Sequence, residues 1–176
     1  MNEEILSSER LYEGRVIKLD RLDVRLSNGL TAMRELVQHP GAVAVVPLDA
    51  ESNVLMVRQY RIAARRVMLE VPAGTLGLNE DPGDCAVREL QEETGYRAER
   101  FESLGGIFVA PGYTTEFIHL YLAMDLVESR LPGDEDEFIE VDRVPLAEAI
   151  AMIDRGEIID GKSIVSLLKV ARQRGI

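Results

Sequence analysis

Residues 74–96, GTLGLNEDPGDCAVRELQEETGY, combine a loop with a short helix, and the rest of the chain is organised around them. Asp81 is a good N-cap, and Pro82 stands at the first helical position, where proline is tolerated best. Gly95 is a natural stop just beyond the last turn. The sequence therefore predicts a helix from about Pro82 to Thr94.

Three glutamates of this helix, Glu89, Glu92 and Glu93, are spaced so that they share one face. Like charges at these spacings destabilise a helix by roughly 0.2–0.5 kcal/mol per pair. A cation bound at this face would explain the cluster, and carboxylates without a Cys/His group favour Mg²⁺ or Mn²⁺. The alternative is a solvated acidic helix face that binds nothing.

The same residues resemble the signature of the Nudix hydrolase family, G-x5-E-x7-R-E-U-x-E-E-x-G-U, where U is a bulky aliphatic residue. The matching positions are Gly74, Glu80, Arg88, Glu89, Leu90, Glu92, Glu93 and Gly95. At the last position Tyr96 replaces an aliphatic residue, a departure that concerns packing at the helix exit. The resemblance covers about residues 40–176 and implies hydrolysis of a nucleoside diphosphate linked to another group.

Composition sets the broad class. With 176 residues, 46% of them apolar and 29% charged, the chain is expected to form one soluble domain, with at most a small appendage. A net charge of −11 argues against a sequence-independent nucleic-acid binder, although a bound metal ion can still attract an anionic substrate. No run is long and apolar enough to span a membrane, and the first residues are not a signal peptide. The single Cys85 excludes an internal disulfide, so we expect a cytoplasmic protein with neither a nucleic-acid nor a membrane partner.

Residues 1–38 are expected to form a small N-terminal antiparallel β subdomain. Residues 1–10 are polar, and we expect them to be frayed. Between Leu11 and Val37 the sequence predicts two or three strands, with a hairpin turn at Asn28-Gly29. Such a hairpin is not stable alone and must pack on another surface.

Residues 39–176 alternate between strands and helices. Strands are expected at 42–48, 54–60, 67–71, 101–109, 116–124 and 138–144, and further helices at 145–155 and 162–174. Strands interleaved with three helices predict an α/β sandwich with a mixed sheet. The Nudix resemblance implies the same α/β/α arrangement for residues 39–176.

Two further features resemble the ADP-ribose pyrophosphatase branch of the family. Residues 70–74, EVPAG, match its E-[IVL]-P-A-G entry to the signature. Pro111 follows the signature by about fifteen residues, and residues 110–116 resemble the pattern S-P-G-x-[ST]-x-E, with Ala110 in place of serine. The implied reaction is Mg-dependent hydrolysis of ADP-ribose to AMP and ribose 5-phosphate. The alternatives are another nucleotide sugar such as GDP-mannose, or a non-catalytic domain that senses a nucleotide.

The resemblance also implies roles for individual residues. The metal ligands are expected to be Glu89, Glu92, Glu93 and the carbonyl of Ala73. Arg88 is expected to hold a glutamate in place, and Glu80 to orient the loop.

The expected general base lies on the acidic loop at residues 131–137. This loop offers Glu135 and Glu137, and Glu137 is preferred. The expected substrate contacts are Arg58, Arg61, Gly112 and Glu116. Glu70 is expected to contact a metal ion or a neighbouring arginine. Because relatives build part of the adenine pocket from a second subunit, the resemblance also implies a homodimer with exchanged N-terminal strands.

Overall fold

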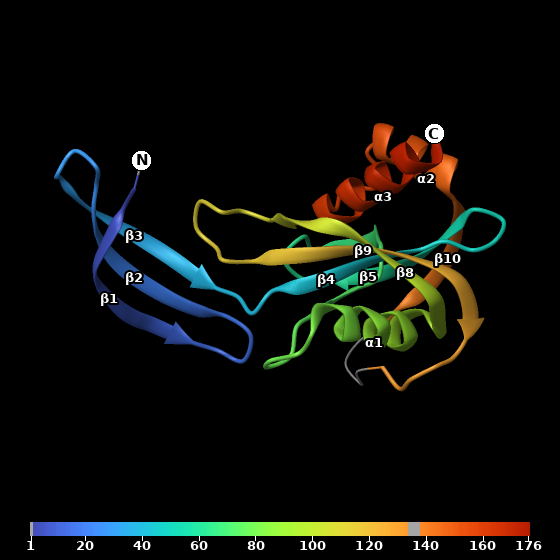
Figure 1. Ribbon diagram of the computed structural model, residues 1–176, viewed down its shortest axis with the longest axis horizontal. Helices are drawn as coiled ribbons and strands as arrows, with labels where there is room; N and C mark the ends of the chain where they lie inside the picture. The colour runs from blue at the N-terminus through green and yellow to red at the C-terminus, as the bar shows by residue number, and fades with distance from the viewer. Residues whose placement is uncertain (1, 134–137) are drawn as a thin grey trace. The chain divides into compact units, whose positions relative to one another are not determined.

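The computed structural model of the chain describes residues 2–133 and 138–176 (Figure 1). The elements in chain order are β1 (Glu4–Glu13), β2 (Lys18–Arg25), β3 (Thr31–Gln38), β4 (Ala42–Pro47), β5 (Asn53–Arg61), β6 (Arg66–Glu70), β7 (Ala73–Thr75), α1 (Pro82–Thr94), β8 (Tyr96–Phe108), β9 (Phe117–Glu128), β10 (Glu140–Pro145), α2 (Leu146–Asp154) and α3 (Gly161–Arg174).

The chain divides into two compact units. The N-terminal unit comprises Met1–Gly41 together with Phe108–Phe117, and the main unit comprises Ala42–Ile107 together with Ile118–Ile176. The domain boundary expected after residue 38 stays a prediction. No helix among residues 2–133 and 138–176 is long and apolar enough to cross a membrane.

The N-terminal unit contains an antiparallel sheet of order β1-β2-β3. The turn predicted at Asn28-Gly29 is confirmed, and Gly29 adopts a φ of 86°, which suits glycine. The expectation of frayed residues 1–10 is wrong, because β1 begins at Glu4. All of β1 is exposed, so its sequence lacks the apolar alternation that marks a strand. β1 pairs antiparallel with β2, and polar side chains such as Ser7 and Asp23, 2.8 Å apart, contact each other across the two strands.

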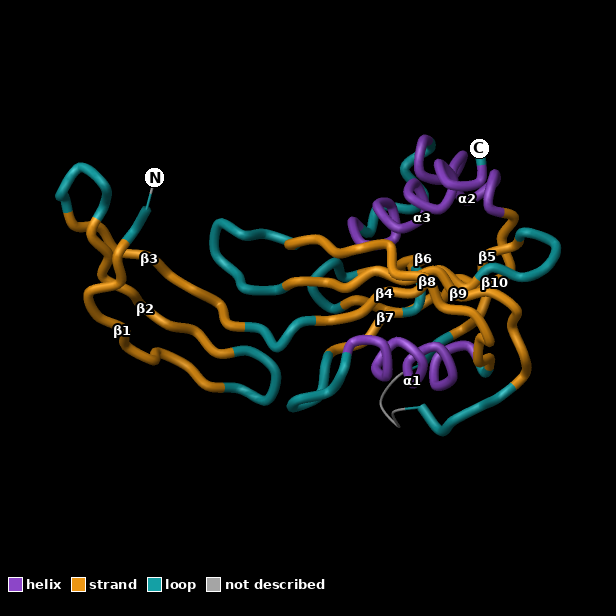
Figure 2. The backbone as a smooth tube through the Cα atoms, in the orientation of Figure 1, coloured by secondary structure: helices purple, strands orange, loops and turns teal. Residues whose placement is uncertain are grey.

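The main unit contains two sheets, of order β7-β4-β9-β8 and β10-β5-β6 (Figure 2). β4 pairs with β9 in parallel and with β7 antiparallel, and β5 pairs antiparallel with both of its neighbours. The predicted mixed sheet and α/β class are therefore confirmed. The largest differences from expectation are that β8 starts at Tyr96, directly after the helix cap, and that β9 continues to Glu128. In addition, β7 is a short strand in residues expected to be a loop.

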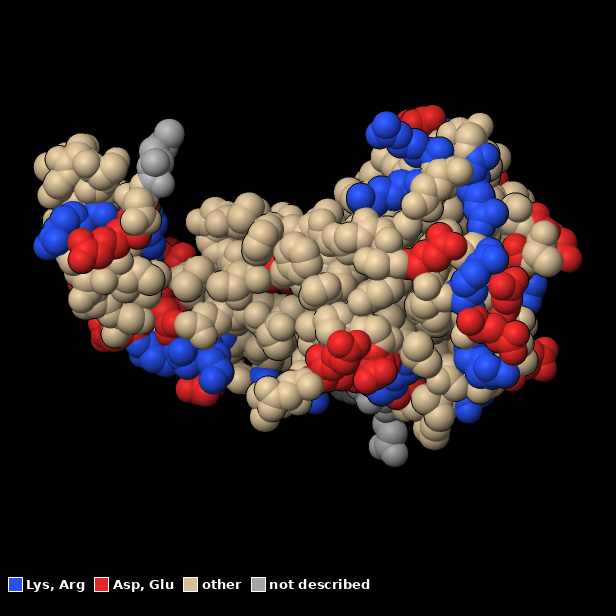
Figure 3. All heavy atoms as spheres, in the orientation of Figure 1, with Lys and Arg blue, Asp and Glu red and all other residues tan. Residues whose placement is uncertain are grey.

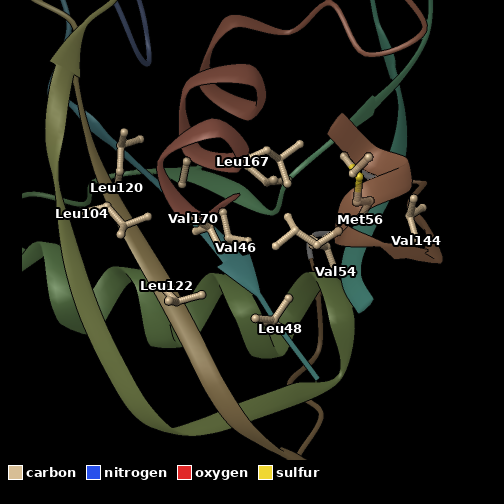
Figure 4. Packing of buried hydrophobic residues seen from close by; sticks show 14 of the residues in the cluster. Val46, Leu48, Val54, Met56, Leu104, Leu120, Leu122, Val144, Leu167 and Val170 are labelled. Atoms are coloured by element: carbon tan, nitrogen blue, oxygen red, sulfur yellow. The ribbon is translucent and has the colours of Figure 1, made fainter. Parts of the chain in front are cut away.

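β4 carries the core of the main unit because both of its faces are buried, as its continuous apolar sequence predicts. One face, which includes Ala44 and Val46, packs with Leu167 and Val170 of α3 (Figure 4). The opposite face, with Val43 and Val45, packs on α1 through a cluster made of Val43, Val45, Cys85, Ala86, Leu90 and Ala123. The strand therefore lies between α1 on one side and the C-terminal helices on the other.

The predicted helix over residues 82–94 is confirmed as α1. The Asp81 side chain accepts from Gly83 N at 2.8 Å, and Gly95 closes the helix in the left-handed conformation with φ 78°. The other two helices are also confirmed, although α2 starts at Leu146 and α3 at Gly161. The acidic face of α1 lies next to β7.

Candidate active site

The first glycine of the signature makes room for a carboxylate. A Cβ placed on Gly74 would lie 1.9 Å from Glu89 Cδ and 2.0 Å from its Oε1. The Glu89 side chain on α1 therefore lies directly against the backbone of β7. Only glycine allows this approach, so this part of the signature has a steric cause.

Glu93, one turn further along α1, is bound to the same strand. Its Oε2 accepts a hydrogen bond from Ala73 N at 3.1 Å. Glu89 and Glu93 are 9% and 8% exposed, which is unusual for ionisable side chains. Two of the three glutamates are therefore fixed against the Ala73–Gly74 backbone.

Arg88 binds three acids of the signature, among them Glu89. Its Nε and Nη2 donate to the two oxygens of Glu80 at 3.0 and 3.2 Å. Its Nη1 donates to Glu89 Oε1 at 2.7 Å and to Glu92 Oε2 at 2.8 Å. One guanidinium thus holds three carboxylates. The expectation that Arg88 positions a glutamate agrees with these contacts.

Glu80 also fixes the loop before α1, since its Oε2 accepts from Gly77 N at 2.7 Å. Hydrogen bonds from Arg88 and then from Gly77 lower the pKa of Glu80 to about 2. Burial raises the pKa of the Cys85 thiol to about 12, so this cysteine is a packing residue rather than a nucleophile.

The donor set on α1 fits a hard divalent cation, because carboxylate oxygens are the ligands such ions prefer. Acidic side chains gather on the surface over α1 (Figure 3). Within residues 2–133 and 138–176, no three acidic, histidine or cysteine side chains already converge on one point, and Arg88 Nη1 lies between Glu89 and Glu92. The roles of Ala73, Glu89, Glu92 and Glu93 as metal ligands stay predictions.

A second ionic group lies at the end of β6. Glu70 is 1% exposed and accepts two hydrogen bonds from Arg61, from Nε at 2.9 Å and from Nη2 at 2.8 Å. Lys162, at the start of α3, contacts Glu70 Oε2 as well. Burial disfavours the charged carboxylate, but the two cations outweigh burial and hold the pKa of Glu70 below its usual value. Of the two expected contacts of Glu70, the structure shows the neighbouring arginine.

The start of α3 is a part of this region that the sequence analysis missed. Asp160 caps the helix by accepting from Ser163 N at 3.0 Å, and it lies 3.0 Å from Lys162 Nζ. Ser163 Oγ accepts from Val71 N at 2.9 Å, which connects the helix to the segment before Ala73. The N-cap signal of Asp160 is visible in the sequence, but nothing there indicates that this cap packs beside Glu70.

The other predicted residues are placed as follows. Arg58 is exposed on β5 and donates to Asp142 at 2.6 Å, whereas Arg61 belongs to the Glu70 group. Gly112 and Glu116 belong to the N-terminal unit. Glu135 and Glu137 lie outside the described residues. The predicted general base is therefore not placed.

Comparison with known proteins gives the relationship of the chain. The family model described as the NUDIX domain matches residues 38–166. A methanol dehydrogenase activator of Bacillus methanolicus is 41% identical over 99% of this chain and 95% of its own length. An ADP-ribose pyrophosphatase of Bacillus subtilis is 38% identical over 95% of this chain and 91% of its own length. A GDP-mannose pyrophosphatase of Yersinia enterocolitica is 37% identical over 77% of this chain and 75% of its own length.

A solved structure shares the fold. The crystal structure of an ADP compounds hydrolase aligns with a TM-score of 0.88 over 99% of this chain and 97% of that chain, at 24% sequence identity. The signature residues form helix α1, Gly74 leaves room for Glu89 against β7, and the family model covers most of the chain. The chain therefore belongs to the NUDIX-domain family of hydrolases.

Proposed function

We propose that this Nudix hydrolase cleaves the pyrophosphate of ADP-ribose to AMP and ribose 5-phosphate. The observation that carries the proposal is the placement of Glu89 and Glu93 against the Ala73–Gly74 backbone, within the EVPAG segment typical of the ADP-ribose pyrophosphatase branch. The relationship to the ADP-ribose pyrophosphatase of Bacillus subtilis supports the choice of substrate.

Nudix hydrolases generally use a divalent metal ion, and we propose Mg²⁺ or Mn²⁺ here. The ligands would be Glu89, Glu92, Glu93 and the Ala73 carbonyl, all of them hard oxygen donors. When bound, the ion would neutralise the negative charge of the pyrophosphate, which otherwise repels a nucleophile. Arg88 would hold Glu89 and Glu92 in place, because it hydrogen-bonds both.

The reaction is attack of water on one phosphorus atom. A new phosphorus–oxygen bond forms to the water, and the bond from that phosphorus to the bridging oxygen breaks. Glu137, or failing that Glu135, takes the proton from the water as general base. Arg61 and Arg58 bind the phosphates, and Gly112 and Glu116 are kept as proposed substrate contacts.

We also propose a homodimer in the cytoplasm. The support for a dimer is β1, which exposes Ile5 at 62%, Leu11 at 48% and Tyr12 at 57%. Apolar side chains exposed on one strand mark a surface that a second chain could cover, which would stabilise the sheet. Light scattering at micromolar concentration measures this directly, and a monomer there would contradict the dimer.

The test of the activity is a substrate panel. AMP or phosphate-product release is measured from ADP-ribose, GDP-mannose, NADH, diadenosine polyphosphates and 8-oxo-dGTP, each with Mg²⁺ and with EDTA. We expect metal-dependent turnover with the highest kcat/KM for ADP-ribose. Preference for GDP-mannose would keep the metal chemistry and replace the substrate. Intact protein without turnover of any compound would favour a nucleotide-sensing domain.

A further inference from the structure

The ionic group at Glu70 is built around a buried negative charge. At 1% exposure the charge of Glu70 is not stabilised by hydration, so the carboxylate needs cationic partners. It has two: Arg61, which binds both of its oxygens, and Lys162, whose side chain is 12% exposed. Lys162 also lies 3.0 Å from Asp160, so this lysine contacts two carboxylates while Glu70 contacts two cations.

Arg61 is bound to Glu70 but is not fully buried. The hydrogen bonds with Glu70 are the main cause that raises the pKa of Arg61, and the negative charges of Glu93 and Asp160 add to it. The Arg61 side chain is 37% exposed, so part of the guanidinium can still be reached by a ligand. If Glu70 relied on Arg61 alone, the positive charge of Arg61 would be fully engaged by that carboxylate.

We propose that Lys162 is a positioning residue that shares the negative charge of Glu70, so that Arg61 keeps positive charge available for a phosphate of the substrate. The inference rests on the proposed function, in which Arg61 binds phosphate. It gives the start of α3, far from the signature in sequence, a part in substrate binding.

The surroundings of Lys162 hold it in this role. Asp160, which lies 3.0 Å from Lys162 Nζ, gives one oxygen to the backbone N–H and the hydroxyl of Ser163 at the helix start, where negative charge is favoured. Ser163 in turn accepts from Val71 N, next to Glu70 in the chain. Lys162 and Glu70 are therefore held together through both the backbone and the side chains.

The first experiment measures binding without turnover. ADP-ribose and inorganic pyrophosphate are titrated by calorimetry, in EDTA, into wild type and Lys162→Met. We expect Kd to rise about tenfold for both probes, the scale of coupling within one ionic network. Lys162→Arg, which keeps the charge, should stay near wild type. Lys169→Met, at an exposed lysine of the same helix, is the matched control and should bind as wild type does.

A double-mutant cycle tests the route through Glu70. In Glu70→Gln the buried charge is absent, so no carboxylate competes with the substrate phosphate for Arg61. Adding Lys162→Met to that variant should change Kd by less than about twofold. Val170→Ala, a buried position on α3, controls for loss of helix packing: it should lower Tm without changing Kd.

The inference is overturned if Lys162→Met binds both probes as tightly as wild type, if its effect is equally large in Glu70→Gln, or if Val170→Ala weakens binding as much. It is also overturned if wild type binds neither probe, because Arg61 would then not be a phosphate contact. The proposed function fails separately, when wild type binds ADP-ribose but does not hydrolyse it with Mg²⁺.

Discussion

The two ionic groups of the main unit differ in charge balance. Around Arg88, one cation holds three carboxylates, those of Glu80, Glu89 and Glu92. Around Glu70, two cations, Arg61 and Lys162, face two carboxylates, those of Glu70 and Asp160. The first group carries excess negative charge, which suits the proposed cation. In the second group the cations equal these two carboxylates in number, and Glu70 itself is buried. Arg61 of the second group stays 37% exposed, as its proposed contact with a phosphate requires.

The largest expected effect comes from the unbalanced group. Glu92→Gln removes a proposed metal ligand and should lower kcat/KM for ADP-ribose by at least about a hundredfold. Its Tm should change little without metal, because the weaker contact with Arg88 offsets the relief of like-charge repulsion on one helix face. Glu99→Gln, at an exposed paired glutamate, is the control. A fall in activity that only follows a fall in Tm would mean that Glu92 is structural.

The next prediction separates position from charge. Gly74→Ala places a methyl group 1.9 Å from Glu89 Cδ, so the Glu89 carboxylate must move. Moving this buried carboxylate strains its 2.7 Å hydrogen bond with Arg88, so we expect the free energy of unfolding to fall by about 1–2 kcal/mol while activity falls at least about tenfold.

The control for Gly74→Ala is Gly161→Ala, where an added Cβ meets nothing within 4 Å. Chemical denaturation and steady-state kinetics on the same preparations separate the two effects. Full activity in Gly74→Ala would show that the exact position of Glu89 is unimportant.

A smaller effect on the free energy of unfolding is expected when the pH is lowered. The folded-state pKa of Glu80 is about 2, below its ordinary value of 4.5, so ionised Glu80 stabilises the fold above about pH 4.5. That contribution is lost as pH falls from about 4.5 towards 2, because the unfolded chain then binds a proton more readily. Urea unfolding of wild type and Glu80→Gln should differ most at pH 6 and converge near pH 2.5. Curves that stay parallel would contradict the assignment.

The smallest expected effect lies at the position where the signature departs from its family. Tyr96 OH accepts from Arg143 at 2.8 Å, and the Arg143 guanidinium lies 5.6 Å from the ring centre. Tyr96→Leu restores the aliphatic residue and should destabilise the fold by about 1 kcal/mol, since Arg143 is exposed. Activity should be unchanged, because these contacts lie outside both ionic groups. Calorimetric unfolding and kcat/KM give the two values.

The sequence predicted the local features well. The helix over residues 82–94 follows from its own cap, proline and stop signals, and β4 follows from its continuous apolar run. It did not predict β1, because a strand that is exposed along its whole length shows no apolar period. The two strands differ because burial leaves a pattern in the residues of β4 and none in those of β1.

The site was predictable only in part, for the same reason. The glutamates of α1 lie close together in sequence and share one face of one helix, so their pattern is visible. Lys162 and Glu70 are far apart in the chain, and only the packing of α3 beside β6 brings them together. A single lysine at a helix start carries no signal of its distant partner.

The contact between Gly74 and Glu89 has a consequence for the evolution of the family. The glycine preserves a space equal to one carboxylate, so the two positions are expected to change together across relatives. A chain with alanine at position 74 should carry a shorter acid, such as aspartate, at position 89, or should have lost hydrolysis altogether. Residue pairs at these two positions could therefore sort active members from domains that have kept only the fold.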